Sequence, residues 1–272
     1  MNATRHNNER IARVFERTKA QGRIALMPYL AIGYPDVETT LALAPALVEA
    51  GADLFELGIP YSDPLADGAT VQRATQVALR NGVTSRVCLE VAATIRRQVD
   101  VPLLLMGYYN PIVHYGPERF CAAAREAGVD GLIVPDVPPE EADTLQAAAT
   151  RNQIDLIYFV APTSTDERLR LVSEIAQGFI YCVSLSGVTG ARSQLSASLP
   201  EYLTRVRRVT RLPLAVGFGI SRPEHVEVVA RYADGAIVAS ALIDLLDRLP
   251  AAEKVTGAAA YIRELAAATA RR

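Results

Sequence analysis

Glu56 stands in the middle of an apolar segment, and a loop with two further acids, Asp63 and Asp67, follows it directly. Burying an ionised carboxylate costs on the order of several kcal/mol unless the group is paired or protonated. Proteins tolerate that cost most often where they need an acid or a base. We therefore expect acid–base chemistry at Glu56; the alternative is a buried glutamate that a neighbouring backbone group satisfies.

The two aspartates lie among turn-forming residues, as Asp63-Pro64 and Asp67-Gly68. Either carboxylate could close an Asx turn or cap a helix that begins near Ala69. The loop alone does not show which of the two, if either, takes part in catalysis.

Three clusters of small residues follow the last three of the expected strands. Small side chains let backbone N–H groups approach a ligand closely, and in barrels of alternating strands and helices the loops after strands seven and eight commonly bind phosphate. The clusters predict a phosphorylated ligand, and the long stretch 184–198 predicts a mobile lid. They are residues 184–192, 217–221 and 239–240.

Large apolar side chains near the same strand ends have a size suited to lining a pocket for a ring. Any one of them could equally be plain core, but as a group they suit an aromatic substrate. They are Tyr29, Met106, Ile133, Phe159 and Phe218.

Eight apolar runs alternate with helical patterns along the chain, which predicts a (β/α)8 (TIM) barrel, an α/β fold, over residues 1–272 as a single domain. An extra N-terminal helix is expected over residues 8–19. The nearly continuous apolar runs indicate a sheet covered on both faces. An open doubly wound sheet is the alternative, and the absence of a GxGxxG motif after the first run disfavours it. The predicted strands are residues 24–32, 54–57, 103–106, 131–134, 156–160, 179–185, 214–216 and 235–239.

The barrel also predicts where Glu56 points. Reactive groups of such barrels lie at the carboxyl ends of the strands. Side chains alternate along a strand, so Glu56 lies on the face opposite to Phe55 and Leu57. If those two pack against the surrounding helices, Glu56 faces the mouth of the barrel.

Composition argues against several classes of function. The chain has 272 residues, is 50% hydrophobic and carries a net charge of −2, so it has no general basic footprint for nucleic acid. Its longest apolar runs are too short to span a bilayer, and the polar N-terminus lacks the apolar core of a secretory signal. Three isolated cysteines and three scattered histidines predict reduced thiols, a cytoplasmic location and no metal site.

Five motifs make the chain resemble the tryptophan synthase alpha subunit over essentially its whole length. The resemblance implies a retro-aldol cleavage of indole-3-glycerol phosphate to indole and glyceraldehyde 3-phosphate, with no cofactor on this chain. The motifs occur in that family's order and are Phe-Glu56-Leu-Gly-Ile-Pro-Tyr-Ser-Asp63-Pro-Leu-Ala-Asp67-Gly, Leu105-Met-Gly-Tyr-Tyr-Asn110-Pro, Val134-Pro-Asp136-Val-Pro138, Ser186-Gly-Val-Thr-Gly190 and Val216-Gly-Phe-Gly-Ile-Ser221.

The resemblance also implies roles for individual residues. Glu56 matches the general acid/base that protonates the indole ring and deprotonates the side-chain hydroxyl. Asp67 matches the carboxylate that binds the indole N–H and stabilises positive charge on the ring. Tyr181 matches a tyrosine beside the glycerol side chain, and Thr189 a lid residue that orients Asp67. The indole pocket matches Tyr29, Met106, Ile133, Phe159 and Phe218, and the phosphate cradle matches Gly190, Gly219, Ala239 and Ser240.

Three residues differ from the family's common pattern. Tyr29 stands where phenylalanine is common, Met106 where leucine is common, and Ala239 where a glycine precedes the phosphate-binding serine. The first two keep an apolar wall, although the Tyr29 hydroxyl needs a partner. Ala239 fits only if its backbone does not need a positive φ.

A partner is implied as well, namely a beta subunit that carries pyridoxal phosphate and completes an α2β2 heterotetramer. Asp63, Asn110 and Pro138 match positions that face this partner, although Pro138 and Asn110-Pro111 could equally serve as turn punctuation. Two other functions stay open: a standalone lyase that releases free indole, and a non-catalytic protein that only activates a partner. The presence of both Glu56 and Asp67 argues against the second.

Overall fold

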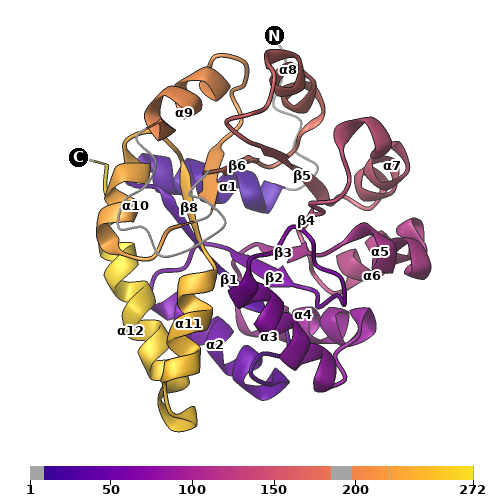
Figure 1. Ribbon diagram of the computed structural model, residues 1–272, viewed down its shortest axis with the longest axis vertical. Helices are drawn as coiled ribbons and strands as arrows, with labels where there is room; N and C mark the ends of the chain where they lie inside the picture. The colour runs from indigo at the N-terminus through magenta and orange to yellow at the C-terminus, as the bar shows by residue number, and fades with distance from the viewer. Residues whose placement is uncertain (1–8, 185–197, 218, 272) are drawn as a thin grey trace.

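The computed structural model describes residues 9–184, 198–217 and 219–271. Its eight strands are parallel and close into one barrel in chain order, with β8 pairing β1. Figure 1 shows the strands at the centre with helices around them. The predicted (β/α)8 barrel is confirmed. The strands are β1 (Ala25–Ala31), β2 (Phe55–Gly58), β3 (Leu103–Met106), β4 (Gly131–Ile133), β5 (Asp155–Val160), β6 (Ile180–Val183), β7 (Leu214–Gly217) and β8 (Gly235–Val238).

The helices cover the outside of the barrel, except for the first one. The N-terminal helix predicted over residues 8–19 is α1. The α-helices are α1 (Glu9–Ala20), α2 (Val37–Glu49), α3 (Ala69–Arg80), α4 (Ser85–Gln98), α5 (Tyr109–Tyr115), α6 (Pro117–Glu126), α7 (Asp143–Arg151), α8 (Asp166–Ile175), α9 (Leu199–Arg207), α10 (Pro223–Ala230), α11 (Ser240–Arg248) and α12 (Lys254–Ala267). Two short 3-10 helices are η1 (Pro139–Glu141) and η2 (Ala251–Glu253).

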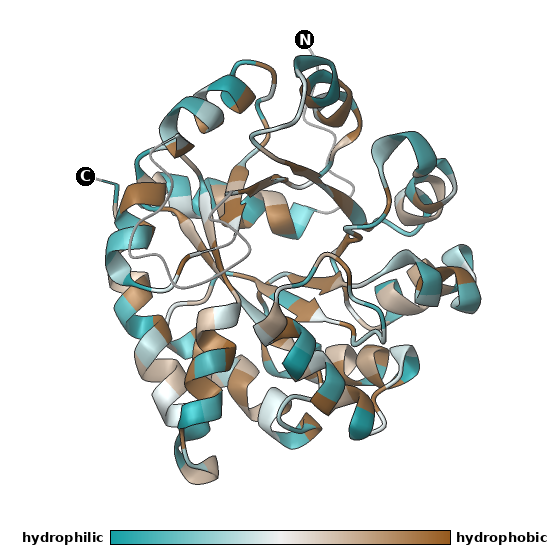
Figure 2. Ribbon diagram, viewed as in Figure 1, coloured by the Kyte–Doolittle hydropathy of each residue, from teal (hydrophilic) through white to brown (hydrophobic). Residues whose placement is uncertain are grey.

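Apolar side chains fill two layers, one inside the barrel and one between the strands and the helices. Figure 2 shows the apolar strands at the centre and hydrophilic residues on the outer sides of the helices. Helix α1 closes the amino-terminal end of the barrel, because Ile11, Val14 and Phe15 belong to the interior layer. The Phe15 ring lies 5.6 Å from the ring of Phe179. This plug leaves the carboxyl-terminal end of the barrel as its mouth.

The amino-terminal end of the barrel is held by a hydrogen bond that recurs four times. In each case the accepting side chain lies one to three residues before an even-numbered strand. The donor is the backbone N–H of the first or second residue of the preceding odd-numbered strand. These bonds tie the strands together in pairs and satisfy N–H groups that would otherwise be buried without a partner. The pairs are Asp53 with Leu26 (3.0 Å), Asp130 with Leu103 (3.0 Å), Gln177 with Leu156 (3.2 Å) and Asp234 with Leu214 (2.9 Å).

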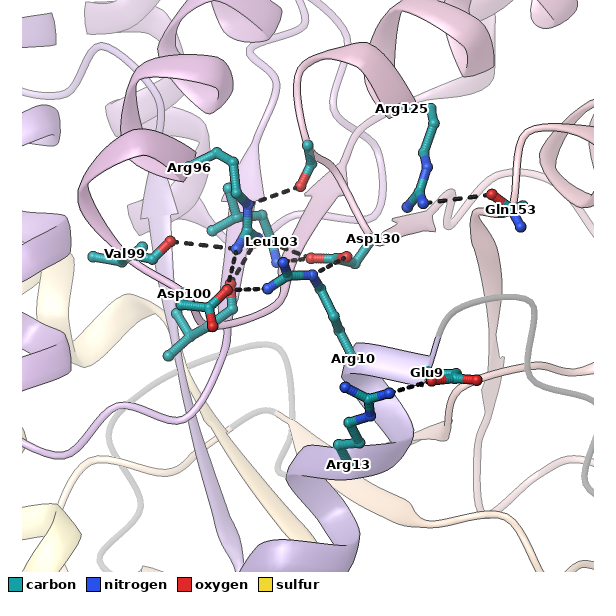
Figure 3. Close-up of polar contacts among 12 residues, drawn as sticks. Glu9, Arg10, Arg13, Arg96, Val99, Asp100, Leu103, Arg125, Asp130 and Gln153 are labelled. Carbon is teal, nitrogen blue, oxygen red and sulfur yellow. Dashed lines mark hydrogen bonds and ion pairs between the residues drawn. The ribbon is translucent and has the colours of Figure 1, made fainter.

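The buried carboxylate of Asp130 is stabilised by two arginines (Figure 3). Its side chain is 2% exposed, and the Arg96 guanidinium donates to it at 2.9 Å while Arg10 of α1 lies 3.8 Å away. Both arginines also contact Asp100, whose side chain is 88% exposed. Arg10 and Arg96 therefore both contact one buried carboxylate, Asp130, and one exposed carboxylate, Asp100.

We expect Asp130→Ala to lower the free energy of unfolding by about 3–5 kcal/mol, because it leaves Arg96 and the Leu103 N–H without their buried partner. The matched control is Asp100→Ala, which removes an exposed carboxylate from the same two arginines and should change stability by less than about 1 kcal/mol. Denaturant titration of both variants measures the difference. Equal losses would contradict the structural role assigned to Asp130.

Two expectations about ligands and membranes can be compared with the described residues. None of the helices in that part of the chain has the length and apolar character needed to cross a bilayer. In the same ranges, no group of three or more His, Cys, Asp or Glu side chains is placed to hold a metal ion. Cys88, Cys121 and Cys182 are buried free thiols.

Candidate active site

Glu56 lies in β2 with its side chain inside the barrel. Phe55 and Leu57 belong to the layer between strands and helices, whereas Leu54 belongs to the interior layer, so alternation along the chain turns Glu56 inward as predicted. Glu56 is 1% exposed, and among the described residues its Oε2 atom has no hydrogen-bond partner. The alternative of a glutamate satisfied by a neighbouring backbone group therefore fails for this oxygen.

Asp67 lies in the loop between β2 and α3, where its carboxylate is hydrogen-bonded by the hydroxyl of Tyr108. That hydroxyl also accepts the backbone N–H of Ala66 at 2.9 Å. The helix α3 has Gly68 at its N-cap, with no side-chain capping bond, so a capping role for Asp67 is excluded. Tyr108 thus connects the loop that carries Asp67 to the end of β3.

Burial and mutual repulsion separate the acidities of the two carboxyl groups. Burial, followed by the negative charge of Asp67, raises the pKa of Glu56 to about 8. Burial raises the pKa of Asp67 to about 6, against the opposing effect of the hydrogen bond from Tyr108. Between these values Glu56 is protonated while Asp67 is ionised. One acid and one anion side by side can donate a proton and stabilise a positive charge in the same event.

Two buried tyrosines share this space. The pKa values of Tyr29 and Tyr181 are raised well above the ordinary value, first by burial and then by the charges of Glu56 and Asp67. Both hydroxyls fit only because glycines lie beside them. A Cβ at Gly58 would lie 2.0 Å from the Tyr29 oxygen, and one at Gly217 would lie 2.3 Å from the Tyr181 oxygen.

The described members of the expected ring pocket lie at neighbouring strand ends. Met106 and Ile133 are register partners in β3 and β4, and Phe159 and Tyr181 are register partners in β5 and β6. The rings of Phe159 and Tyr181 are 4.5 Å apart. Together they form an apolar wall inside the barrel, next to the strand that carries Glu56. Phe218 lies outside the described residues.

The expected phosphate cradle is described at three of its four positions. Ser240 is the first residue of α11, whose leading N–H groups have no partner within the helix. Ala239 precedes it with φ −117°, so the alanine meets the condition of a negative φ. Gly219 has φ +80°, a conformation that favours glycine. Gly190 and Thr189, with most of the stretch expected to form a lid, lie outside the described residues.

The three residues expected to face a partner lie in the segments that follow β2, β3 and β4: Asp63 and Pro138 in loops, and Asn110 in the first turn of α5. Asn110 donates a hydrogen bond to the Tyr61 hydroxyl at 3.1 Å, which joins the first two loops. Asp136 accepts the N–H of Tyr109 at 2.9 Å, which joins the second and third. Asp63 and Asn110 are exposed, and Pro138 is half-buried. They therefore share one rim of the barrel mouth.

Tyr108 is the site residue that the sequence patterns missed. It stands in the quoted stretch Leu105–Pro111, two residues after the end of β3, which is the signal that could have found it. Its ring stacks on Tyr61 with centroids 5.2 Å apart. Tyr108 thus lies between Asp67 and the rim that holds Asn110.

We expect Tyr108→Phe to move the acid limb of the pH–activity profile to higher pH. The lost hydrogen bond lowers the pKa of Asp67, so its removal leaves less ionised Asp67 at low pH. A hydrogen bond worth about 1 kcal/mol moves this limb by about 0.7 pH unit, which predicts about threefold lower activity near pH 6 and little change near pH 8. Tyr61→Phe removes a hydroxyl from the same rim, and this control should keep the parent profile. Identical profiles for Tyr108→Phe and the parent would exclude this role.

Comparison with known proteins gives the same family throughout. The family model described as tryptophan synthase alpha chain matches residues 15–270. The tryptophan synthase alpha chain of Chloroflexus aurantiacus is 59% identical over 263 residues, which cover 96% of this chain and 99% of the relative. The corresponding chain of Roseiflexus sp. is 55% identical over 257 residues, 94% of this chain and 98% of the relative.

Solved structures agree. A structure of Mycobacterium tuberculosis tryptophan synthase superposes with a TM-score of 0.89 at 40% identity, covering 100% of both chains. A tryptophan synthase alpha chain from Legionella pneumophila superposes with a TM-score of 0.88 at 36% identity, covering 96% of this chain and 97% of the other. The chain therefore belongs to the tryptophan synthase alpha chain family and is a lyase that cleaves indole-3-glycerol phosphate to indole and glyceraldehyde 3-phosphate in tryptophan biosynthesis, with no cofactor of its own.

Proposed function

We propose that Glu56 and Asp67 divide the proton transfer and the charge stabilisation of this cleavage between them. The observation that carries the proposal is the state of Glu56: it is 1% exposed, and among the described residues its Oε2 atom has no partner. With its pKa raised to about 8, the group holds a proton near neutral pH and has an oxygen available for substrate. Asp67 is its ionised neighbour.

In the proposed step, the Glu56 carboxyl donates its proton to C3 of the indole ring. The ring nitrogen then carries positive charge, which the Asp67 carboxylate stabilises through the indole N–H. The bond between C3 and the glycerol chain breaks, and its electrons return to the ring. The Glu56 carboxylate takes the proton of the neighbouring hydroxyl, which becomes the aldehyde of glyceraldehyde 3-phosphate. The glutamate ends protonated, as it began.

The remaining residues of the proposed site bind and orient the substrate. The ring would lie against Tyr29, Met106, Ile133 and Phe159, with Tyr181 beside the glycerol chain. Ser240 at the start of α11, with Ala239 and Gly219, supplies backbone N–H groups for the phosphate. Phe218, Thr189 and Gly190 complete the proposal by resemblance.

A crystal structure of the Glu56→Gln variant soaked with indole-3-glycerol phosphate tests this placement, because the variant should bind the substrate without cleaving it. We expect the phosphate against Gly219 and Ser240 and the indole nitrogen within hydrogen-bond distance of Asp67. A ring bound away from Asp67, or a phosphate at another end of the barrel, would overturn the assignment.

We further propose that the rim carrying Asp63, Asn110 and Pro138 docks a tryptophan synthase beta subunit in an α2β2 assembly. Support comes from two exposed apolar side chains on the same rim: Leu65 is 94% exposed and Val113 is 50% exposed. Pyridoxal phosphate would then belong to the other subunit. The same proposal treats residues 1–272 as one domain. It also places the protein in the cytoplasm, with the biosynthetic reactions of the family.

A pull-down with a cognate beta subunit tests the partner. Leu65→Asp should weaken the complex by about tenfold or more, because a charge replaces a desolvated apolar contact. The control Ala42→Asp changes an exposed residue of α2 and should leave the complex intact. Absence of a complex together with rapid turnover by the chain alone would favour the standalone lyase.

A further inference from the structure

A cationic cleft opens at the amino-terminal end of the barrel, opposite to the mouth. Its volume is about 670 Å³, and its lining includes five cationic side chains against one carboxylate, that of Asp234. The chain as a whole carries a net charge of −2, so this concentration of positive charge is local. The cationic residues are Lys19, Arg207, Arg211, Arg231 and Arg271.

The position of the cleft follows from where its residues stand in the chain. Lys19 is in the last turn of α1, Arg211 follows α9, and Arg231 follows α10, so each lies ahead of a strand. The C-terminal segment that carries Arg271 emerges beside α10 (Figure 1). Asp234 precedes β8 and Ser240 follows it, so the length of that strand, roughly 15–20 Å at about 3.3 Å per residue, separates the cleft from the proposed phosphate cradle.

Two of the five cations are already engaged. Arg207 and Arg271 both pair with Asp234, which also accepts the backbone N–H of Leu214. Burial raises the pKa of this carboxyl, but these partners together outweigh it and hold the pKa below its ordinary value. Arg207 also donates to the Leu212 carbonyl at 2.8 Å. These contacts are structural, because Asp234 is one of the four side chains that accept a strand N–H at this end of the barrel.

The other three cations are not used in this way. Within the described ranges, the side chains of Lys19, Arg211 and Arg231 have no ion-pair or hydrogen-bond partner, although backbone groups of Lys19 and Arg231 are bonded. Basic residues are favourable at helix ends, where they complement the helix dipole, and this accounts for Lys19 in α1. It does not account for Arg211 and Arg231, which lie beyond the ends of their helices and bond to no carbonyl there. Three free cations in one concave site present donors to a single multivalent anion.

We propose that this cleft binds a polyphosphate anion through Lys19, Arg211 and Arg231. We expect at least two phosphate groups in the ligand, because three separate cations line the cleft and must outweigh the carboxyl ends of α1, α9 and α10, which oppose any anion. Arginine favours phosphate because its guanidinium donates two parallel hydrogen bonds. Tyr232, 41% exposed in the lining, offers a ring face to a base attached to the phosphates. The site is independent of the lyase reaction, because it lies at the opposite end of the barrel.

Isothermal titration of the full chain with inorganic triphosphate tests the site. The double variant Arg211→Glu/Arg231→Glu should weaken binding by about tenfold or more, while leaving indole release within twofold of the parent. The control Arg86→Glu/Arg97→Glu makes the same change of net charge on the exposed side of α4 and should keep the parent affinity. Triphosphate binding that is insensitive to both double variants would place the ligand at the mouth and overturn the proposal.

The outcomes separate the possibilities. Weakening confined to the Arg211/Arg231 variant supports the site, and tighter binding of adenosine triphosphate than of triphosphate, lost in Tyr232→Ala, identifies the base-binding face. Equal weakening in both double variants would reduce the effect to general charge and overturn the proposal. Absence of triphosphate binding by the parent chain at near-physiological salt would overturn it as well.

Discussion

Replacing Glu56 by glutamine is expected to lower the rate of indole release by at least about 10³, because glutamine keeps the shape of the side chain but cannot exchange a proton. Binding of a phosphate-bearing ligand should stay within a few-fold of the parent, since the cradle at Gly219 and Ser240 is not touched. Glu49→Gln, which changes an exposed glutamate at the end of α2, is the matched control and should keep parent activity. Equal activity in Glu56→Gln would remove this residue from the mechanism.

The pH–rate profile makes the prediction sharper. The proposed mechanism needs Asp67 ionised and Glu56 protonated, so the rate should rise through about pH 6 and fall through about pH 8. The two groups influence each other, so these limbs describe the pair. Residual activity of Glu56→Gln should lack the alkaline limb, because the group that loses its proton there is gone. A limb near pH 8 that survives the substitution would assign it to another residue.

Glu56→Gln should raise the folding stability although it lowers the activity. The pKa of Glu56 is raised from 4.5 in the unfolded chain to about 8 in the folded one. Below pH 4.5 both states are protonated; as the pH rises from 4.5 to 8, the unfolded state alone releases its proton and folding stability falls. Relative to the parent, Glu56→Gln should therefore gain roughly 3 kcal/mol of unfolding free energy between pH 4.5 and 7. Denaturant titrations at the two pH values measure this difference.

Replacing Asp67 by asparagine is expected to lower the rate of cleavage by about 10²–10³. Asparagine keeps an oxygen that can accept the indole N–H but removes the charge that we propose stabilises the protonated ring. The loss should fall mainly on kcat, because the positive charge exists only after C3 is protonated. The negative charge of Asp67 also raises the pKa of Glu56, so the alkaline limb should move to lower pH in the variant.

Asp63→Asn is the control for this substitution, since Asp63 lies in the same loop but is exposed. Measured on the isolated chain, it should retain activity within a few-fold of the parent. Comparable losses in both variants would indicate that the loop acts through its overall conformation. An alkaline limb unmoved in Asp67→Asn would contradict the electrostatic link between the two acids.

Much of the fold could be predicted from the sequence because its signals are local. Each apolar run predicted a strand that the structure confirms to within about two residues at its described ends, and the alternation around Glu56 predicted its inward direction. Alternation depends only on the geometry of one strand, so neighbouring residues suffice to infer it. The family resemblance was also local, since it rested on short contiguous motifs.

The details of the site could not be predicted in this way, because they depend on distances between strands. Tyr108 reaches Asp67 from the next loop, and Gly58 makes room for a tyrosine of the neighbouring strand. The loop sequence alone left the two aspartates equivalent, and the family resemblance separated them. The packing adds that Asp67 is bonded to Tyr108 while Asp63 stays exposed.

The sequence by itself determined the barrel, the inward glutamate and the family. Only the tertiary structure decided how the pKa values of Glu56 and Asp67 differ, because a pKa depends on the burial and the charges that surround a group in three dimensions. It also decided which cations remain free: Arg207 and Arg211 are near neighbours in the chain, yet one is bound to Asp234 and the other faces an open cleft. Partners of this kind come from distant segments, and only the closed barrel brings them together.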